Sequence, residues 1–223
     1  RPTEFDDLVA LVALYRPGAM DQIGTYAKGK REPSTVTIRD PRLAPILGKT
    51  YGVILYQEQA MQIATQLAGF SGAKADDLRK AIGKKDRVAM GKLEPEFREG
   101  CKASNTEAHV IDWMWTTNEK SADYSFNRSH AACYALIAYR TAWLKANFPA
   151  EYMAALISSV MDTKDKVPIF INRCEEMGIE ILPPDVNLSD HAFVVDNGAI
   201  RFGLDAVKGV GYQAVEAIKA SRE

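Results

Sequence analysis

A cluster of basic residues between positions 79 and 92 carries the clearest potential for phosphate binding in this sequence. The stretch holds six basic side chains and a single acidic one. Arg79 and Lys80 come just before a glycine that is typical of a helix end. Lys84 and Lys85 follow on the predicted turn. Such side chains can converge on phosphate oxygens through charge-assisted hydrogen bonds. A solvated basic turn would have the same composition, so the pattern alone leaves both interpretations open.

A second candidate is the start of a long apolar helix predicted over residues 129–147. Ser129 is a suitable N-cap, which would place Arg128 and His130 where free amides and the helix dipole attract anions. His130 and Tyr134 are four residues apart and share a helix face. The residues between them are small, so a flat ring could approach this face closely, as stacked bases do. A helix whose His and Tyr are satisfied core residues would show the same spacing.

A third candidate precedes the last predicted helix and consists of Lys208, Gly209, Val210 and Gly211. An apolar-Lys-Gly-apolar-Gly turn that opens a helix is the pattern of a helix-hairpin-helix motif. Its glycines allow backbone amides to approach a DNA phosphate. An ordinary turn is the alternative, because only the C-terminal side of this hairpin is clearly predicted as helix.

Several kinds of chemistry are missing from the sequence. Cys101, His109, His130 and Cys133 do not have the spacing of a structural zinc site. The sequence contains no Walker-type phosphate loop and no Ser nucleophile elbow. The acidic pairs at 6–7 and 76–77 fit helix capping or a solvated surface rather than the clustered aspartates of two-metal catalysis. We therefore expect a chain that binds phosphates and holds neither a metal nor catalytic residues of its own.

Composition limits the class of protein. Lys plus Arg (28) nearly cancels Asp plus Glu (29), which excludes a protein that coats polyanions over its whole surface. The longest strictly apolar run, residues 131–139, is about half of what a membrane-spanning helix needs. Three scattered cysteines do not form a secreted disulfide framework. With no start methionine and no signal-peptide pattern, we expect a cytoplasmic protein without membrane contact, cut from a longer chain.

Hydrophobic periodicity predicts a mostly α-helical protein with a small α+β segment at its C-terminus. We place the boundary between residues 1–165 and 166–223. A polar connection is expected over residues 27–50, with a short strand at 35–38. A strand at 179–182 and a hairpin of 191–195 with 199–202 around Asp196-Asn197-Gly198 are expected near the end. The expected helices cover residues 3–15, 61–67, 73–82, 86–103, 106–120, 129–147, 149–161, 166–177 and 212–221.

Nine segments of the sequence, taken in order, resemble one family. They are YRPG at 15–18, YGVILYQEQ at 51–59, LRKAIGKK at 78–85, FNRSHAACY at 126–134, WLK at 143–145, PAEYMAAL at 149–156, LPPDVN at 182–187, IRFGL at 200–204 and KGVG at 208–211. Together they resemble the fingers region of the C-family replicative DNA polymerases, the bacterial DNA polymerase III α subunits. The resemblance implies a multi-helical fingers domain, residues 1–165, followed by a segment, residues 166–223, that leads into the helix-hairpin-helix region.

The resemblance implies a role for the basic cluster in binding the incoming deoxynucleoside triphosphate (dNTP). By their place in the motif, Arg79 and Lys80 would contact the phosphates, with Lys84 and Lys85 adding charge at longer range. Lys80 stands where the family usually has a second arginine. A lysine keeps the charge but cannot bind a phosphate bidentately.

The same resemblance implies that His130 and Tyr134 pack against the nascent base pair. Asn127, Arg128 and Ser129 would shape the start of their helix and belong to the same nucleotide site. Lys208, Gly209, Val210 and Gly211 would contact the backbone of duplex DNA.

As part of a DNA-directed DNA polymerase, a nucleotidyltransferase, this chain would be inactive alone. The family's palm, which lies upstream, carries the aspartates that bind Mg²⁺, and we expect no cofactor in this fragment. Expected partners are dNTP, primer-template DNA, the palm and thumb, and replisome subunits such as the clamp and clamp loader through regions outside this chain. Two alternatives are a stand-alone helical DNA-binding module with a helix-hairpin-helix end and a protein-interaction scaffold whose basic turn is only surface. We expect a monomer.

Overall fold

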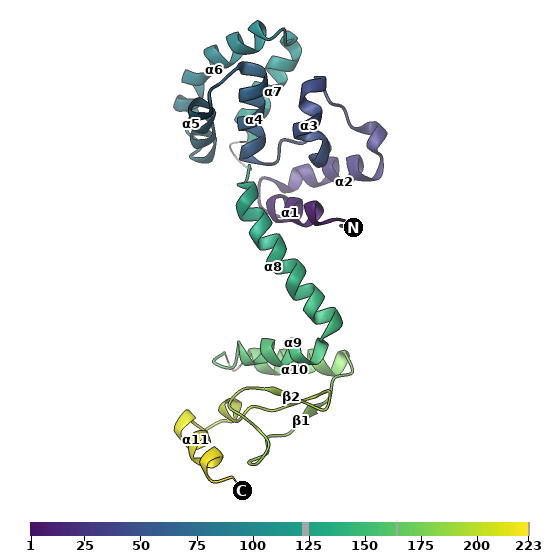
Figure 1. The fold of residues 1–223 in the computed structure, drawn as a ribbon, viewed down its shortest axis with the longest axis vertical. Helices are drawn as coiled ribbons and strands as arrows, with labels where there is room; N and C mark the ends of the chain where they lie inside the picture. Colours follow the sequence, from purple (N-terminus) through teal and green to yellow (C-terminus); the bar gives the residue numbers. More distant parts are fainter. Residues whose placement is uncertain (122–124, 164, 223) are drawn as a thin grey trace. The chain divides into compact units, whose positions relative to one another are not determined.

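The computed structural model describes residues 1–121, 125–163 and 165–222, and most of them are helical (Figure 1). The contacts divide the chain into two compact units, Arg1–Ile137 and Ala138–Glu223. The helices and the small sheet near the C-terminus confirm the predicted, mostly α-helical fold. The boundary predicted after residue 165 lies within the second unit, between two of its helices, and stays a prediction. Within the part of the chain that the structure describes, no helix combines the length and apolar character needed to cross a membrane.

The first unit consists of helices joined by short turns. Its helices are α1 (Phe5–Leu14), α2 (Ile23–Arg31), α3 (Ala44–Leu47), α4 (Gln57–Ala68), α5 (Gly72–Gly83), α6 (Arg87–Ala103), α7 (Ala108–Ser121) and the beginning of α8 (Arg128–Asn147). Single 3-10 turns lie at Met20–Gln22, Pro33–Thr35, Pro41–Leu43 and Gly48–Thr50.

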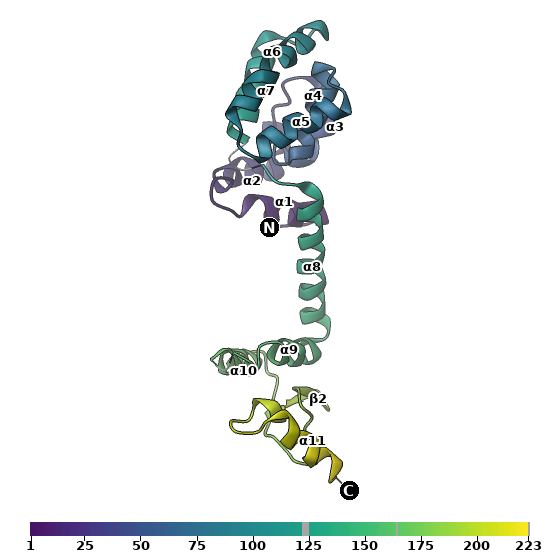
Figure 2. The same cartoon turned by 90° about the vertical axis from the view of Figure 1, so that its left-hand side faces the viewer.

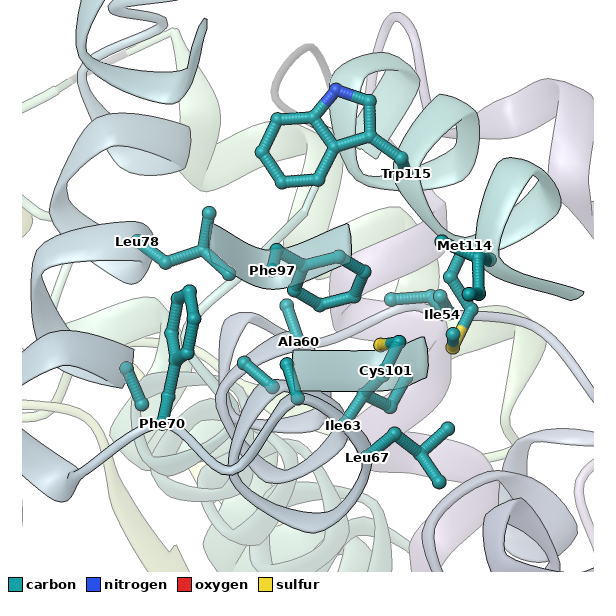
Figure 3. Close-up of a cluster of buried hydrophobic side chains, with 14 of the residues drawn as sticks. Ile54, Ala60, Ile63, Leu67, Phe70, Leu78, Phe97, Cys101, Met114 and Trp115 are labelled. Atoms are coloured by element: carbon teal, nitrogen blue, oxygen red, sulfur yellow. The ribbon is translucent and has the colours of Figure 1, made fainter. Parts of the chain in front are cut away.

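Helices α4 to α7 enclose the larger core of this unit (Figure 3). Phe97 of α6 is fully buried, and its ring lies 6.0 Å from Phe70 and 5.3 Å from Trp115, measured between ring centroids. Aromatic rings at such separations attract one another beyond the gain from burial. A glycine, Gly100, allows α6 to approach α4 closely, since a Cβ atom there would lie 1.9 Å from the carbonyl oxygen of Ala68.

A smaller core joins α1 and α2 to the start of α8. Asp7 of α1 is buried beside it, and its carboxylate accepts hydrogen bonds from Tyr26 Oη (3.1 Å), Lys30 Nζ (2.6 Å) and the backbone amide of Thr3 (2.7 Å). Burial alone would raise the pKa of Asp7. The hydrogen bonds outweigh burial and lower the pKa to about 2, so the carboxylate stays ionised and holds α2 against α1.

The region from residue 27 to 50 is more helical than the sequence predicts. Helix α2 continues to Arg31, and α3 forms later in the same region. Contacts with residues distant in sequence stabilise α2. Its Tyr26 packs edge-to-face on Tyr51, with the two ring centroids 4.9 Å apart. The predicted strand at 35–38 is wrong: residues 36–38 have no regular secondary structure and pair with no strand.

The second unit packs helices on a small sheet (Figure 2). The sheet order is β1-β3-β2, with β1 parallel and β2 antiparallel to β3. Asn197 and Gly198 have φ angles of 53° and 85°, as a two-residue hairpin turn requires, so the predicted hairpin is confirmed. The elements are α9 (Pro149–Ser158), α10 (Lys166–Glu176), β1 (Ile181–Leu182), β2 (Val194–Asp196), β3 (Ala199–Arg201), a 3-10 turn (Leu204–Ala206) and α11 (Tyr212–Ala220).

We predict that Gly100→Ala destabilises the first unit, whereas Gly91→Ala in the same helix stabilises it. The new methyl group at position 100 would overlap the Ala68 carbonyl, at a cost of about 1–3 kcal/mol or more. Position 91 has open space, and alanine is better than glycine in a helix by about 1 kcal/mol. Urea unfolding of both variants measures the difference. Equal midpoints for the two variants would contradict the close backbone approach.

Candidate functional site

Helix α8 begins at Arg128, directly after Asn127. The Asn127 Oδ1 atom accepts a hydrogen bond from the His130 amide at 2.8 Å, and its carbonyl accepts one from the Ala131 amide at 3.1 Å. Asn127 is therefore the N-cap. The prediction that Ser129 caps this helix is wrong, because the helix already includes Ser129 in its first turn.

A carboxylate from another helix covers the beginning of α8. Glu58 of α4 accepts hydrogen bonds from the Arg128 amide at 2.9 and 3.1 Å and from Asn127 Nδ2 at 2.7 Å. The amides of Arg128 and His130 are thus already bound, and a negative charge already faces the positive end of the helix dipole. The prediction that these two amides are free for an anion is wrong.

The positive charge of the Arg128 side chain is also paired with a carboxylate. Its guanidinium group lies 3.2 Å from Asp6 and 5.8 Å from the centre of the Tyr56 ring. Lys49 binds the same carboxylate at 2.9 Å. The hydrogen bond from Lys49, and more weakly the charge of Arg128, holds the pKa of Asp6 below its ordinary value. The charge of Arg128 is therefore directed at Asp6.

Three aromatic rings form a row at the same place. His130 lies 5.5 Å from Phe126 and 4.9 Å from Tyr134, measured between ring centroids. The Arg16 guanidinium carbon lies 4.3 Å from the centre of the Phe126 ring, within cation–π range. His130 and Tyr134 share a helix face, as their spacing predicts, and Tyr134 is 55% exposed. Both rings are therefore accessible to a ligand rather than buried in a core.

Two neighbouring alanines on α8 keep the rings of His130 and Tyr134 outside the core. Ala131 and Ala135 are fully buried against the smaller core of the first unit. Because each alanine follows His130 or Tyr134 by one residue, it lies about 100° around the helix from them, and the two aromatic rings stay outside the core contact.

The basic cluster lies at the end of α5 and on the following turn. Asp76 binds both Arg79 Nε (2.7 Å) and Lys80 Nζ (2.9 Å). Lys84 and Lys85 are exposed, and neither forms an ion pair with any other described residue. The left-handed φ of Lys85, 56°, turns the chain directly into α6. Two of the four predicted phosphate ligands thus have a carboxylate partner, and two point into solvent.

Gln57, the first residue of α4, connects the basic cluster to the aromatic row. Its backbone amide donates to the Phe126 carbonyl at 3.1 Å, and the Phe126 amide donates to Leu55 at 3.2 Å. At the other side, a Cβ atom on Gly83 would lie 3.1 Å from Gln57 Nε2. The end of α5 and the residue Phe126 therefore both lie beside the N-terminus of α4, within one compact unit.

Arg16, Gln57 and Glu58 were not among the predicted site residues. Arg16 is followed by Pro17 and Gly18, so the sequence there indicates only a helix end. It gives no sign of the contact between Arg16 and Phe126. Glu58 lies some seventy residues from Asn127 in the sequence, and no local pattern relates the two. The signal that could have identified all three is their place inside the family segments at 15–18 and 51–59.

The third candidate, residues 208–211, forms a tight turn before α11. Gly209 has a φ of +88°, and the Val210 amide donates to the Val207 carbonyl at 3.1 Å. Lys208 is exposed. Gly211 is the N-cap of α11 and provides no side chain for the first-turn amides. On the N-terminal side the hairpin is preceded by one 3-10 turn rather than an α-helix.

His191 ties the two sides of this turn together. Its Nδ1 atom lies 2.9 Å from Asp205 before the turn, and its Nε2 atom lies 2.7 Å from Glu216 on α11. Its ring stacks on Tyr212 with centroids 4.3 Å apart. Hydrogen bonds with Glu216 and then Asp205 raise the pKa of His191, against the opposing charge of Lys219. When it is protonated, the ring can donate to both carboxylates and so join the two flanks of the turn.

Metal-binding groups are sparse. Across residues 1–121, 125–163 and 165–222, no three His, Cys, Asp or Glu side chains are placed to hold a metal ion together. Of the acids at the basic cluster, Asp76 is bound to Arg79 and Lys80, and Asp86 accepts a hydrogen bond from the Ala89 amide at the start of α6. The described residues of the cluster therefore do not fit a magnesium site.

Comparison with known proteins agrees with this arrangement. A family model described as the bacterial DNA polymerase III alpha subunit finger domain matches residues 1–105, and a helix-hairpin-helix model matches residues 178–223. The DNA polymerase III subunit alpha of Xylella fastidiosa (strain Temecula1) is 45% identical over 223 residues, which is 100% of this chain and 19% of the relative. The chain belongs to the family of bacterial DNA polymerase III α subunits.

Other α subunits match equally well. That of Mycobacterium leprae is 46% identical over 228 residues, 100% of this chain and 19% of the relative. That of Treponema pallidum is 45% identical over 213 residues, 96% of this chain and 18% of the relative. The chain thus spans about 19% of the length of the curated α subunits that it matches. The family resemblance and the helix-hairpin-helix segment are confirmed, whereas the roles of individual site residues stay predictions.

We predict that Glu216→Gln lowers the pKa of His191 toward its ordinary value of about 6.5. The substitution removes the charge of the first of its two hydrogen-bonding partners. An NMR titration of the imidazole ring measures the shift, with Glu107→Gln, which is remote from this cluster in sequence and lies in the first unit, as control. An unchanged midpoint in Glu216→Gln would contradict the bridge.

The sign of the stability effect follows from the raised pKa. Protonated His191 stabilises the fold most fully below the unfolded pKa, and this contribution is lost as the pH rises through the folded pKa. Relative to His191→Gln, wild type should therefore show its greatest advantage in urea midpoint below about pH 6. A difference that grows toward pH 9 would be the opposite result.

Proposed function

We propose that this chain acts as the fingers of a DNA polymerase III α subunit and binds the incoming dNTP and the nascent base pair during template-directed DNA synthesis. One observation carries the proposal: Gln57 contacts both Gly83, at the end of α5 before the basic turn, and Phe126, whose ring adjoins His130. A triphosphate and a base pair need a basic and an aromatic surface at neighbouring positions.

In this proposal the basic turn binds the triphosphate. Lys84 and Lys85 offer cations that have no ion-pair partner in the described part of the chain. Arg79 uses its Nε atom on Asp76, so its two terminal nitrogens can bind phosphate oxygens without breaking that bond. Lys80 must exchange Asp76 for phosphate. Positive groups placed in advance stabilise the charge on the phosphates at little reorganisation cost.

The exposed face of α8 then meets the base pair. His130 and Tyr134 present tilted rings side by side, with an interplanar angle of 57°. A base pair of correct width packs on such a surface and leaves the triphosphate on the basic turn. A mismatched pair would displace the rings or the phosphates, so correct pairing is favoured by geometry. Asn127 contributes by fixing where the helix begins, and Ser129 lies in its first turn.

The C-terminal turn has a different role. We propose that Lys208, Gly209, Val210 and Gly211 bind the phosphate backbone of duplex primer-template DNA. The absence of side chains at both glycines allows amides to approach a phosphate, and Lys208 adds a charge. These contacts would hold the duplex without reading its sequence.

The chemical step belongs to other parts of the polymerase. Nucleotidyl transfer needs Mg²⁺ held by carboxylates, which in this proposal are in the palm. The palm and thumb, the clamp and the clamp loader would be partners of the parent protein, through regions outside this chain. The proposal places the protein in the bacterial cytoplasm, where chromosomal DNA is copied.

A second candidate function is a DNA-binding module that acts on its own. The helix-hairpin-helix match over residues 178–223 favours it. Such a module would bind duplex DNA with strong salt dependence and without any effect of dNTP. The two functions therefore differ in whether a triphosphate contacts the first unit.

We predict that Arg79→Ala and His130→Ala, placed in an α subunit that contains this sequence, each lower the rate of single-nucleotide incorporation at least tenfold. Each variant removes one positioning contact of a kind that supports about one or two orders of magnitude in rate. Single-turnover kinetics at saturating and limiting dNTP measure rate and affinity separately. Lys102→Ala, an exposed lysine on α6, is the control. Unchanged rate and affinity in both variants would overturn the assignment.

We also predict that dNTP shifts amide resonances of this chain at the basic turn and at the start of α8. The expected shifts centre on residues 79–85 and 130–134, because both surfaces are exposed in the structure. NMR titration with dNTP and then with primer-template duplex measures them. Shifts confined to residues 208–211 on adding duplex, with none from dNTP, would favour the stand-alone DNA-binding module.

A further inference from the structure

A groove of about 600 Å³ lies in the first unit, away from the residues assigned above. One wall is α2, the other is the segment of residues 35–39, and Trp113 of α7 closes one side. Tyr51 and Gly52 contribute to the lining. The proposed nucleotide and duplex contacts use none of these residues.

The second wall presents a row of polar side chains. Thr35, Thr37 and Arg39 line the groove and are exposed, whereas Val36 and Ile38 between them are partly buried. Thr35 ends a 3-10 turn, and Val36 also lines the groove, so this wall is an irregular segment. It presents two hydroxyl groups and one guanidinium group to the groove.

Helix α2 supplies the opposite wall. Gly24, Thr25 and Lys28 lie on one helix face and line the groove. Lys28 is exposed, and no ion pair joins it to another described residue. Gly29 allows α2 to lie close to Tyr51, since a Cβ atom at position 29 would lie 2.6 Å from Tyr51 Cβ. The single acid among the described lining residues is Asp21.

Arg39 is held in place by an aromatic ring. Its guanidinium carbon lies 5.2 Å from the centre of the Trp113 ring, a cation–π contact of about 0.5–1 kcal/mol at an exposed site. When a guanidinium group lies over an aromatic ring, the N–H groups in its plane remain available to donate hydrogen bonds to a ligand. Such N–H groups suit the oxygens of a phosphate group.

We propose that this groove binds the sugar–phosphate backbone of single-stranded DNA. An open groove with hydroxyl groups, two cations and partly exposed aromatic residues is the kind of surface that binds a single strand without reading its sequence. The inference rests on the proposed function only in that DNA is a ligand of this chain. It adds a strand-binding surface that is separate from the dNTP site and from the turn at residues 208–211.

The test is binding of a fluorescein-labelled 16-nucleotide oligothymidylate to the 223-residue chain, followed by fluorescence anisotropy over a range of salt concentrations. The double variant Lys28→Ala/Arg39→Ala should bind about tenfold more weakly. Its slope of log K against log salt should fall by about 1.4, which is 0.7 for each lost phosphate contact. The matched control Lys102→Ala/Lys120→Ala removes the same charge from exposed positions on α6 and α7 and should bind like wild type.

A second measurement needs no variant. Amide shifts of wild-type chain on adding the oligothymidylate should centre on residues 24–28 and 35–39. Equal affinity of the two double variants, or absence of strand binding by wild type, would each overturn the proposal. Loss of the dNTP shifts at residues 79–85 would instead count against the proposed function, so the two failures are distinguishable.

Discussion

The hydrogen bonds from the start of α8 to Glu58 are the interaction on which the candidate site depends. One carboxylate binds the first amide of α8 and the side chain of its N-cap, Asn127, and so joins the N-termini of two helices that are distant in sequence. The adjacent Gln57 meets Phe126 through its backbone and the end of α5 through its side chain. Together these contacts decide where the aromatic row and the basic turn lie relative to each other. They also explain why the helix start presents side chains rather than free amides to a ligand.

The charges of the first unit fall into two classes. Lys30, Lys49 and Arg128 bind Asp7 or Asp6 and hold elements together. Lys84 and Lys85 stand in solvent without such a partner among the described residues. A net charge near zero therefore conceals local positive surfaces, because the acids that balance the total are used in structural pairs elsewhere.

Features set by local sequence were predictable, and features set by distant contacts were not. Asn197-Gly198 specifies its own turn, since both residues must adopt positive φ, and the hairpin followed as expected. The shared face of His130 and Tyr134 also follows from helix geometry alone. In contrast, the N-cap of α8 was misplaced because Ser129 and Asn127 are both suitable caps, and Glu58 from another helix accompanies the one that forms. Helix α2 was missed because Tyr51 and Asp7 stabilise it from outside its own sequence.

The contact of Gly100 with Ala68 has a consequence for how the basic turn is supported. No side chain separates α4 from α6 at this point, so their separation is fixed by the radii of backbone atoms rather than by rotamers. Helix α5 and the turn after it connect these two helices, which that contact holds together. Lys84 and Lys85 therefore extend as long, flexible side chains from a turn between closely packed helices. By rotating about side-chain bonds, their ammonium groups can follow a phosphate through a small displacement while the backbone of the helices stays in place.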